Sequence, residues 1–123
     1  MFVNFTNHPY SIWDEKQRTA AAVYGECVDM PFPNIEPQMD EEEVNRMADD
    51  YAERIISMGE DCVLVVHVMG EFTFCYALIR RLQNAGIRCV ASCTERDVTI
   101  ADDGSKTTKF HFARFREYVL LDS

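Results

Sequence analysis

The chain has 123 residues, of which 47% are hydrophobic, and its formal net charge is −9. This length fits one compact domain with its own core, and no apolar run approaches the roughly 20 residues of a membrane span. Because an acidic chain repels the phosphate backbone, we expect neither duplex nucleic acid nor a membrane as its partner. The start of the chain lacks the basic flank and apolar stretch of a signal peptide, which favours the cytoplasm.

The acidic residues are concentrated in the first half of the chain. Residues 1–58 hold twelve acidic side chains against four basic ones, whereas the remainder is nearly balanced. A small phosphorylated ligand therefore remains possible in the second half, because it responds to the local field only. The five cysteines include no CxxC pair, which favours buried free thiols and no metal cofactor.

The N-terminal residues predict a strand followed by a helix. Residues 2–6 (FVNFT) are β-prone, and Pro9, which cannot donate to a sheet, ends this strand. Ser11 and Asp14 match a capping box, so we expect a helix that begins there and runs to about Tyr24. The apolar side of this helix should pack on the sheet.

A second strand and a second helix follow. Residues 26–30 (ECVDM) predict a brief strand, and the three prolines within 31–37 predict an ordered surface loop. Asp40 and the acidic residues after it match a helix N-terminus, which accounts for this acidic run better than a metal site does. Apolar residues then recur with the spacing of an amphipathic helix, which should end at Gly59.

The middle of the chain predicts a central strand, a turn and a helix. Residues 62–68 are mostly apolar, as is typical of a strand covered on both faces. A turn at 69–71 (MGE) leads into an apolar-periodic helix that should end near 85–86, and residues 87–92 predict the next buried strand. The order β-α-β-α-β-α-β predicts parallel strands joined by right-handed crossovers.

The C-terminal segment predicts an antiparallel hairpin. Residues 97–101 and 107–112 flank a turn-rich loop that contains an Asp-Gly pair. We therefore expect a single α/β domain over residues 1–123, Rossmann-like and three-layered, with a mostly parallel sheet and this hairpin at its end. Phenylalanines in this region either close one end of the core or form a dimer surface. They are Phe110, Phe112 and Phe115.

Three polar segments follow the predicted parallel strands at the same edge of the sheet. They are 6–9 (TNHP), 69–73 (MGEFT) and 93–96 (CTER). In a doubly wound sheet of strand order 2-1-3-4, ligands bind beyond the carboxyl ends of the first and third strands. We therefore expect the three segments to form one crevice that holds the functional site.

Several side chains of these segments suit a small nucleotide ligand. His8 can exchange a proton near neutral pH, and Arg96 offers a planar fork for phosphate. Gly70 allows close approach of a backbone or a ligand, and Thr73 either caps the third helix or donates to a phosphate. Glu71 is a candidate for binding ribose hydroxyls, for general base or for a partner of the helix dipole.

Structural roles explain some of these residues equally well. His8 can brace a loop before a proline, and Arg96 can pair with Glu95 or Asp97. His67 lies within the apolar strand, so we expect a satisfied core residue there.

Four short signatures, NFTNHP, WDEKQRTAA, VHVMGEFTF and ASCTER, give the chain a likeness to a known family. In these it resembles the small stand-alone CRISPR-associated Rossmann-fold (CARF-like) proteins, the ring-nuclease-like group. The resemblance implies a homodimer that binds a cyclic oligoadenylate second messenger across its two-fold axis in type III CRISPR signalling. Such a dimer either cleaves the messenger or sequesters it.

The resemblance also implies roles for individual residues. No metal is needed, because the ring's own 2′-hydroxyl would attack the adjacent phosphorus while the protein holds the geometry and stabilises charge. His8 would be the acid or base, and Arg96 and the amides of residues 70–73 would hold phosphate. The chain departs from this family in being acidic and poor in lysine at this edge, which suits binding less well than a basic central cavity would. Cleavage is therefore a weaker expectation than binding.

The remaining residues of the implied site contact the nucleoside. Asn7 or Glu71 would read adenine or ribose, and Thr94 and Glu95 complete the set of ligand-binding residues. Two other classes of function stay open. The layout is similar to that of nucleoside deoxyribosyltransferases, with Glu71 or Glu95 as nucleophile, and a non-enzymatic interaction subunit is the third alternative.

Overall fold

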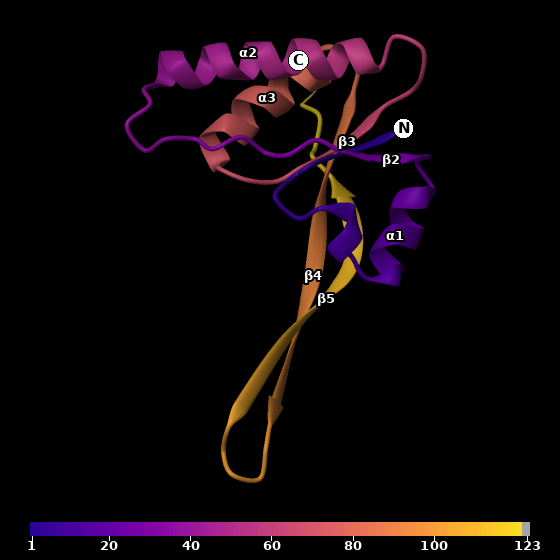
Figure 1. Ribbon diagram of the computed structural model, residues 1–123, viewed down its shortest axis with the longest axis vertical. Coiled ribbons are helices and arrows are strands. Elements are labelled where there is room, and N and C mark those ends of the chain that lie inside the picture. The colour runs from indigo at the N-terminus through magenta and orange to yellow at the C-terminus, as the bar shows by residue number, and fades with distance from the viewer. Residues whose placement is uncertain (122–123) are drawn as a thin grey trace.

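The computed structural model describes residues 1–121 and contains a five-stranded sheet with helices on both faces (Figure 1). The strand order is β2-β1-β3-β4-β5, in which β5 alone is antiparallel to its neighbour. The strands are β1 (Phe2–Phe5), β2 (Cys27–Asp29), β3 (Val65–Val68), β4 (Arg88–Ile100) and β5 (Lys106–Glu117). The helices are α1 (Glu15–Ala22), α2 (Glu41–Met58) and α3 (Phe72–Asn84). The predicted Rossmann-like α/β fold with a C-terminal hairpin is confirmed.

The central strands bury side chains on both faces. Because side chains alternate along a strand, Phe5 and Val66 face one way while Phe2 and Val65 face the other. The first pair packs with the buried residues of α2 and α3, and the second pair packs with Ala21 of α1 and with aromatic residues. Figure 1 shows α2 and α3 together on one side and α1 on the other. We call the second side the α1 face.

Of the N-cap residues predicted for the first two helices, only that of α2 is the one observed. Residues 10–12 form a 3-10 turn, and Asp14 is the N-cap of α1, with its Oδ1 accepting from the Gln17 amide at 2.8 Å. The predicted start at Ser11 is therefore wrong. Asp40 caps α2 as expected, since its Oδ1 accepts from the amide of Glu43 at 2.9 Å.

The hairpin is much longer than the sequence predicts. Residues 93–96, which we expected as a loop, belong to β4, and pairing with β5 runs from Val90–Glu117 to Ile100–Lys106. The two strands project from the body as an arm (Figure 1), which we define as residues 94–112. Residues 93–96 are exposed or half-buried, so no alternation of buried and exposed side chains marks this part of β4 as a strand.

A β-bulge at the base of the arm places two phenylalanines on one face. The pairing shifts between Cys93 and Thr94, which leaves Ala113 as the extra residue. Residues three apart in a regular strand face opposite ways, and the extra residue reverses this. Phe112 and Phe115 therefore both bury their rings on the α1 face, with centroids 4.9 Å apart.

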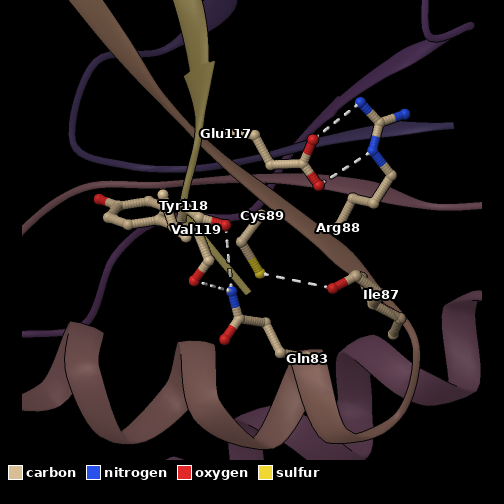
Figure 2. Close-up of polar contacts among 7 residues, drawn as sticks. All are labelled: Gln83, Ile87, Arg88, Cys89, Glu117, Tyr118 and Val119. Carbon is tan, nitrogen blue, oxygen red and sulfur yellow. Dashed lines mark hydrogen bonds and ion pairs between the residues drawn. The ribbon is translucent and has the colours of Figure 1, made fainter. Parts of the chain in front are cut away.

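Figure 2 shows how the end of β5 is fixed to β4 and α3. Arg88 donates twice to the carboxylate of Glu117, with both N–O distances at 3.2 Å. The Gln83 side-chain amide donates to the carbonyl of Tyr118 at 3.2 Å. The hydroxyl of Tyr118 donates to the carbonyl of Val68 at 2.8 Å, and burial raises the pKa of Tyr118 to about 12. The chain after β5 is thus held over the end of β3.

The five cysteines are free thiols of different exposure. Burial raises the pKa of Cys75 to about 11 and that of Cys89 to about 12, so both stay protonated near neutral pH. Cys62 is exposed before β3, so its predicted burial in the central strand is wrong. Within residues 1–121, no three histidine, cysteine or acidic side chains are grouped to hold a metal. No helix among them has the length and apolar character to cross a membrane.

Gly70 packs directly against the ring of Phe32, which the proline-rich loop supplies. A Cβ atom at position 70 would lie 2.4 Å from Cζ of Phe32. This ring is buried and contacts Phe5 and Phe74, with centroids 5.3 and 5.4 Å away, so it has little room to retract. The close approach that Gly70 permits is therefore made here by an aromatic side chain.

We expect Gly70→Ala to lower the free energy of unfolding by about 1–3 kcal/mol, because the added methyl group overpacks the core at Phe32. The same substitution should cost much less in a Phe32→Ala background, where the ring is gone. Urea unfolding of the wild type, both single variants and the double variant measures this coupling. Equal costs in the two backgrounds would contradict the contact.

Candidate functional site

A cleft of about 780 Å³ opens at the carboxyl ends of β1 and β3, beside the middle of β4, on the α1 face of the sheet. Its polar lining includes side chains that follow β1 and side chains on β3 and β4. Trp13 and Phe112 add aromatic walls. This is the place at which a doubly wound sheet binds its ligands. The polar lining consists of Thr6, Asn7, His8, Asp14, Gln17, His67, Ser92 and Thr94.

Each of the three predicted segments contributes to this cleft. Asn7 and His8 come from the loop after β1, Gly70 from the turn after β3, and Thr94 from β4. Glu71 lines a neighbouring hollow of about 290 Å³ together with Asn7. The sequence therefore predicts the place of the cleft, although its third wall is a strand where we expected a loop.

Arg96 and Glu95 lie on opposite faces of the arm. Arg96 pairs across the ribbon with Phe110, which lines the cleft, so the two share the cleft side of the arm. Arg96 is two residues beyond Thr94, roughly 7 Å along the strand. Glu95 pairs with His111 on the other face. The arm thus places Arg96, but not Glu95, on the cleft side.

The N-terminus of α3 is capped by Glu71. Its carboxylate accepts from the amides of Thr73 and Phe74, at 2.6 and 3.1 Å, and the Thr73 hydroxyl donates to it at 2.7 Å. The Thr73 hydroxyl, followed by the two amides, lowers the pKa of Glu71. The alternative of Thr73 as the helix cap is wrong, because the carboxylate two residues earlier already reaches the free amides.

This cap bears on two of the functions that the sequence left open. A phosphate at the N-terminus of α3 would have to displace the Glu71 carboxylate from the same amides. A general base at Glu71 requires a raised pKa, and the direction here is the opposite. Neither Glu71 nor Glu95 lines the main cleft, so the geometry does not favour either as the nucleophile of an N-glycosidic enzyme.

A row of polar side chains crosses the sheet beside the cleft. Asp29, Asn4 and His67 are lateral neighbours on β2, β1 and β3. The Asn4 amide nitrogen donates to Asp29 Oδ1 at 2.9 Å and to the carbonyl of His8 at 2.8 Å. Its oxygen accepts from the Thr6 hydroxyl at 2.9 Å and lies 3.0 Å from Nδ1 of His67. Since the nitrogen of the amide faces two acceptors, its oxygen faces His67, and Nδ1 of His67 carries the proton.

His67 is 2% exposed and lies among aromatic rings. The ring centroids of Phe2, Trp13 and Phe115 are 6.0, 5.7 and 5.2 Å from its own. Burial, and then the nearby positive charge of His8, lower the pKa of His67 from 6.5 to about 4. Nδ1 is hydrogen-bonded, but Nε2 has no protein partner among residues 1–121. The predicted core location is confirmed, whereas the predicted full satisfaction is wrong.

Several residues of the cleft were not predicted from the sequence as part of a site. Trp13 lines the cleft, and its indole nitrogen donates to the carbonyl of His8 at 2.9 Å, which fixes the loop after β1. Ser92 ends the predicted fourth strand, and its hydroxyl donates to Met69 Sδ at 3.1 Å. The position of Ser92 at a strand end was a usable signal. His67 gave none, since a histidine within an apolar strand is usually a core residue.

Residues 1–116 match the model of the family described as Uncharacterized protein MJ1673 family. The chain belongs to this family. The matched residues include every residue that lines the cleft, and the whole arm. The family description states no ligand, activity or partner. No curated protein and no solved structure matches the chain.

The lowered pKa of His67 predicts a loss of stability in mild acid. The unfolded histidine takes up a proton below about pH 6.5, whereas the folded one stays neutral until about pH 4, so acid favours the unfolded state. Between pH 7 and pH 5 this difference amounts to about 2 kcal/mol. We expect wild-type protein to lose that much more stability over this interval than His67→Gln, as measured by urea unfolding. Parallel losses in the two proteins would contradict the assignment.

Proposed function

We propose that this protein binds a cyclic oligoadenylate in the cleft at the carboxyl ends of β1 and β3, beside the middle of β4. The observation that supports this best is the combination of aromatic walls with amide, hydroxyl and imidazole side chains in the cleft, and an arginine farther along the cleft side of the arm. Bases stack on aromatic rings, amide and hydroxyl groups read bases and riboses, and a guanidinium holds phosphate. The resemblance of the sequence to the ring-nuclease-like group supports the same ligand.

The local charge suits a small nucleotide even though the chain is acidic. Most acidic residues lie in the first 58 residues, and α2, which carries many of them, packs on the opposite face of the sheet from the cleft. On the cleft side of the arm, the charged residues in the ladder are Arg96 and Lys106. A ligand at the arm end of the cleft therefore lies near Arg96, whereas Lys106 lies near the tip of the arm. Asp14 lines the cleft, so a phosphate group should lie at the arm end and away from this carboxylate.

We propose that two chains associate through their arms, so that each gives the same cleft to half of a symmetric ring. The cleft side of the arm carries Val98, Ile100 and Phe110, which are 47, 66 and 67% exposed. Apolar side chains gathered on one face of a two-stranded ribbon mark an association surface. A two-fold dimer covers such a face with the same face of the second chain.

We expect cyclic tetra-adenylate or cyclic hexa-adenylate to raise the thermal midpoint of the protein. Arg96→Ala should raise the Kd of the bound ring roughly tenfold to a hundredfold, because a charge-assisted contact to phosphate is lost. Arg116→Ala removes a guanidinium from the opposite face of the same ribbon and should leave the Kd unchanged. Isothermal titration calorimetry measures both.

If neither ring binds at high concentration, the proposed ligand is overturned. An equal effect of the two arginine substitutions would remove Arg96 from the site. Product analysis of the same mixtures shows whether the ring is cut. If it is, His8→Ala separates proton transfer from binding, because it should abolish the product while the ring still binds.

The arm predicts the oligomeric state. We expect sedimentation velocity to give the mass of two chains for the wild type and of one chain for Ile100→Glu, because a buried charge at an apolar interface is costly. Ile100 does not line the cleft, so the substitution tests association alone. Thr107→Glu, on the opposite face of the arm, is the matched control and should remain dimeric. A monomeric wild type would contradict the dimer.

A further inference from the structure

His67 lines the cleft, and one nitrogen of its imidazole ring forms no hydrogen bond with the described residues of the protein. Its Nε2 is buried and has no hydrogen-bond partner among residues 1–121. We propose that Nε2 of His67 is a ligand-binding atom that accepts a hydrogen bond from a small N–H or O–H donor of a bound nucleoside. This inference rests on the proposed function, and it names the group that recognises the nucleoside.

The hydrogen bonds around Asn4 define the chemical state of this atom. The side chain of Asp29 accepts from the Asn4 amide nitrogen, so the Asn4 oxygen is turned toward His67. An amide oxygen can only accept, and therefore Nδ1 of His67 donates to it. In a neutral imidazole the other nitrogen then carries a lone pair. The row Asp29, Asn4 and His67 thus holds Nε2 as an acceptor and the ring in one orientation.

The surroundings of His67 make an unused acceptor unusual. Rings of Phe2, Trp13 and Phe115 surround the imidazole, and none of them offers a donor to Nε2. The one indole N–H among them already donates to the carbonyl of His8. Buried polar atoms are almost always paired in native proteins, so an unpaired one on a side chain that lines a cleft indicates a partner that enters from the cleft.

The chemistry of a lone pair in this place selects the donor. A phosphate oxygen or a carbonyl oxygen is itself an acceptor and is repelled. Because Nε2 is buried, the group that reaches it must be small and must project from the body of the ligand. The 6-amino group of adenine and the 2′-hydroxyl of ribose both meet these conditions. They are the two sources that the experiment must separate.

The decisive experiment pairs two ligand analogues with two His67 variants. Cyclic tetra-adenylate is compared by calorimetry with its analogue built from purine riboside, which lacks the 6-amino groups, and with its 2′-deoxy analogue. Wild-type protein should bind one of the two analogues roughly tenfold more weakly than the parent ring, the effect of one lost hydrogen bond. His67→Phe, which has no acceptor, should bind that analogue and the parent equally. His67→Gln, whose amide oxygen can accept, should restore part of the preference.

A second measurement uses the wild type alone, so it does not depend on the folding of a variant. In protein with ¹⁵N-labelled histidine, the free state should show His67 protonated at Nδ1. Addition of cyclic tetra-adenylate should then shift the Nε2 resonance, which a purely structural histidine would not do. Adenosine 5′-monophosphate serves as a second probe in the same experiment.

The binding and resonance data distinguish failure of the role of His67 from failure of the proposed cyclic ligand. If the ring binds while the Nε2 resonance stays unchanged, the role of His67 is overturned and the proposed function stands. If the ring does not bind but adenosine 5′-monophosphate shifts Nε2, the role of His67 stands and the cyclic ligand is overturned. If neither probe binds, both are overturned. A preference for the parent ring that persists in His67→Phe also contradicts the role of His67.

Discussion

The side-chain amide of Asn4 is the group on which the cleft depends. It lies in the middle of the sheet and joins three strands and a loop, because its nitrogen donates to Asp29 and to the carbonyl of His8 while its oxygen accepts from Thr6 and faces His67. All of its hydrogen-bonding capacity is used, as a buried amide requires. The same bonds fix the course of the loop after β1 and the tautomer of His67. One side chain therefore determines both the shape of this cleft at the loop after β1 and the protonated nitrogen of His67.

Most of the fold follows from the sequence because its signals are local. The β-α-β order, the amphipathic spacing of α2 and the Asp-Gly turn each depend on near neighbours, and each is found as predicted. The errors concern competition between equivalent signals. Ser11 and Asp14 are both good caps, and Thr73 is by residue type a better cap than Glu71, yet tertiary packing decides which side chain reaches the free amides. The continuity of β4 through residues 93–96 escaped prediction, because these residues are exposed or half-buried and form no apolar face in the sequence.

The site was predictable in location but not in composition. Polar residues after three strands show where side chains gather, since parallel strands end at one edge. The partners of Asn4 depend on register, which aligns Asn4 with Asp29 on one side and with His67 on the other, and no local pattern states that register. The bulge at Ala113 likewise decides that Phe110 lies on the cleft side of the arm, beside Arg96. Without this extra residue, the side chain of Phe110 would have turned away from the cleft.

In the proposed dimer, the arm would link the cleft to association, because one face would serve both. A two-stranded ribbon is marginally stable by itself. Between Phe112 and the tip of the arm, neither a helix nor a third strand lies beside this one among the described residues (Figure 1). Its cleft side nevertheless carries apolar residues next to Arg96, and Phe110 belongs to the cleft wall. A second chain that covers this face also closes the open side of the cleft, and a ligand held there contacts the same ribbon. Association and binding then stabilise the same arrangement of the arm, so each should strengthen the other.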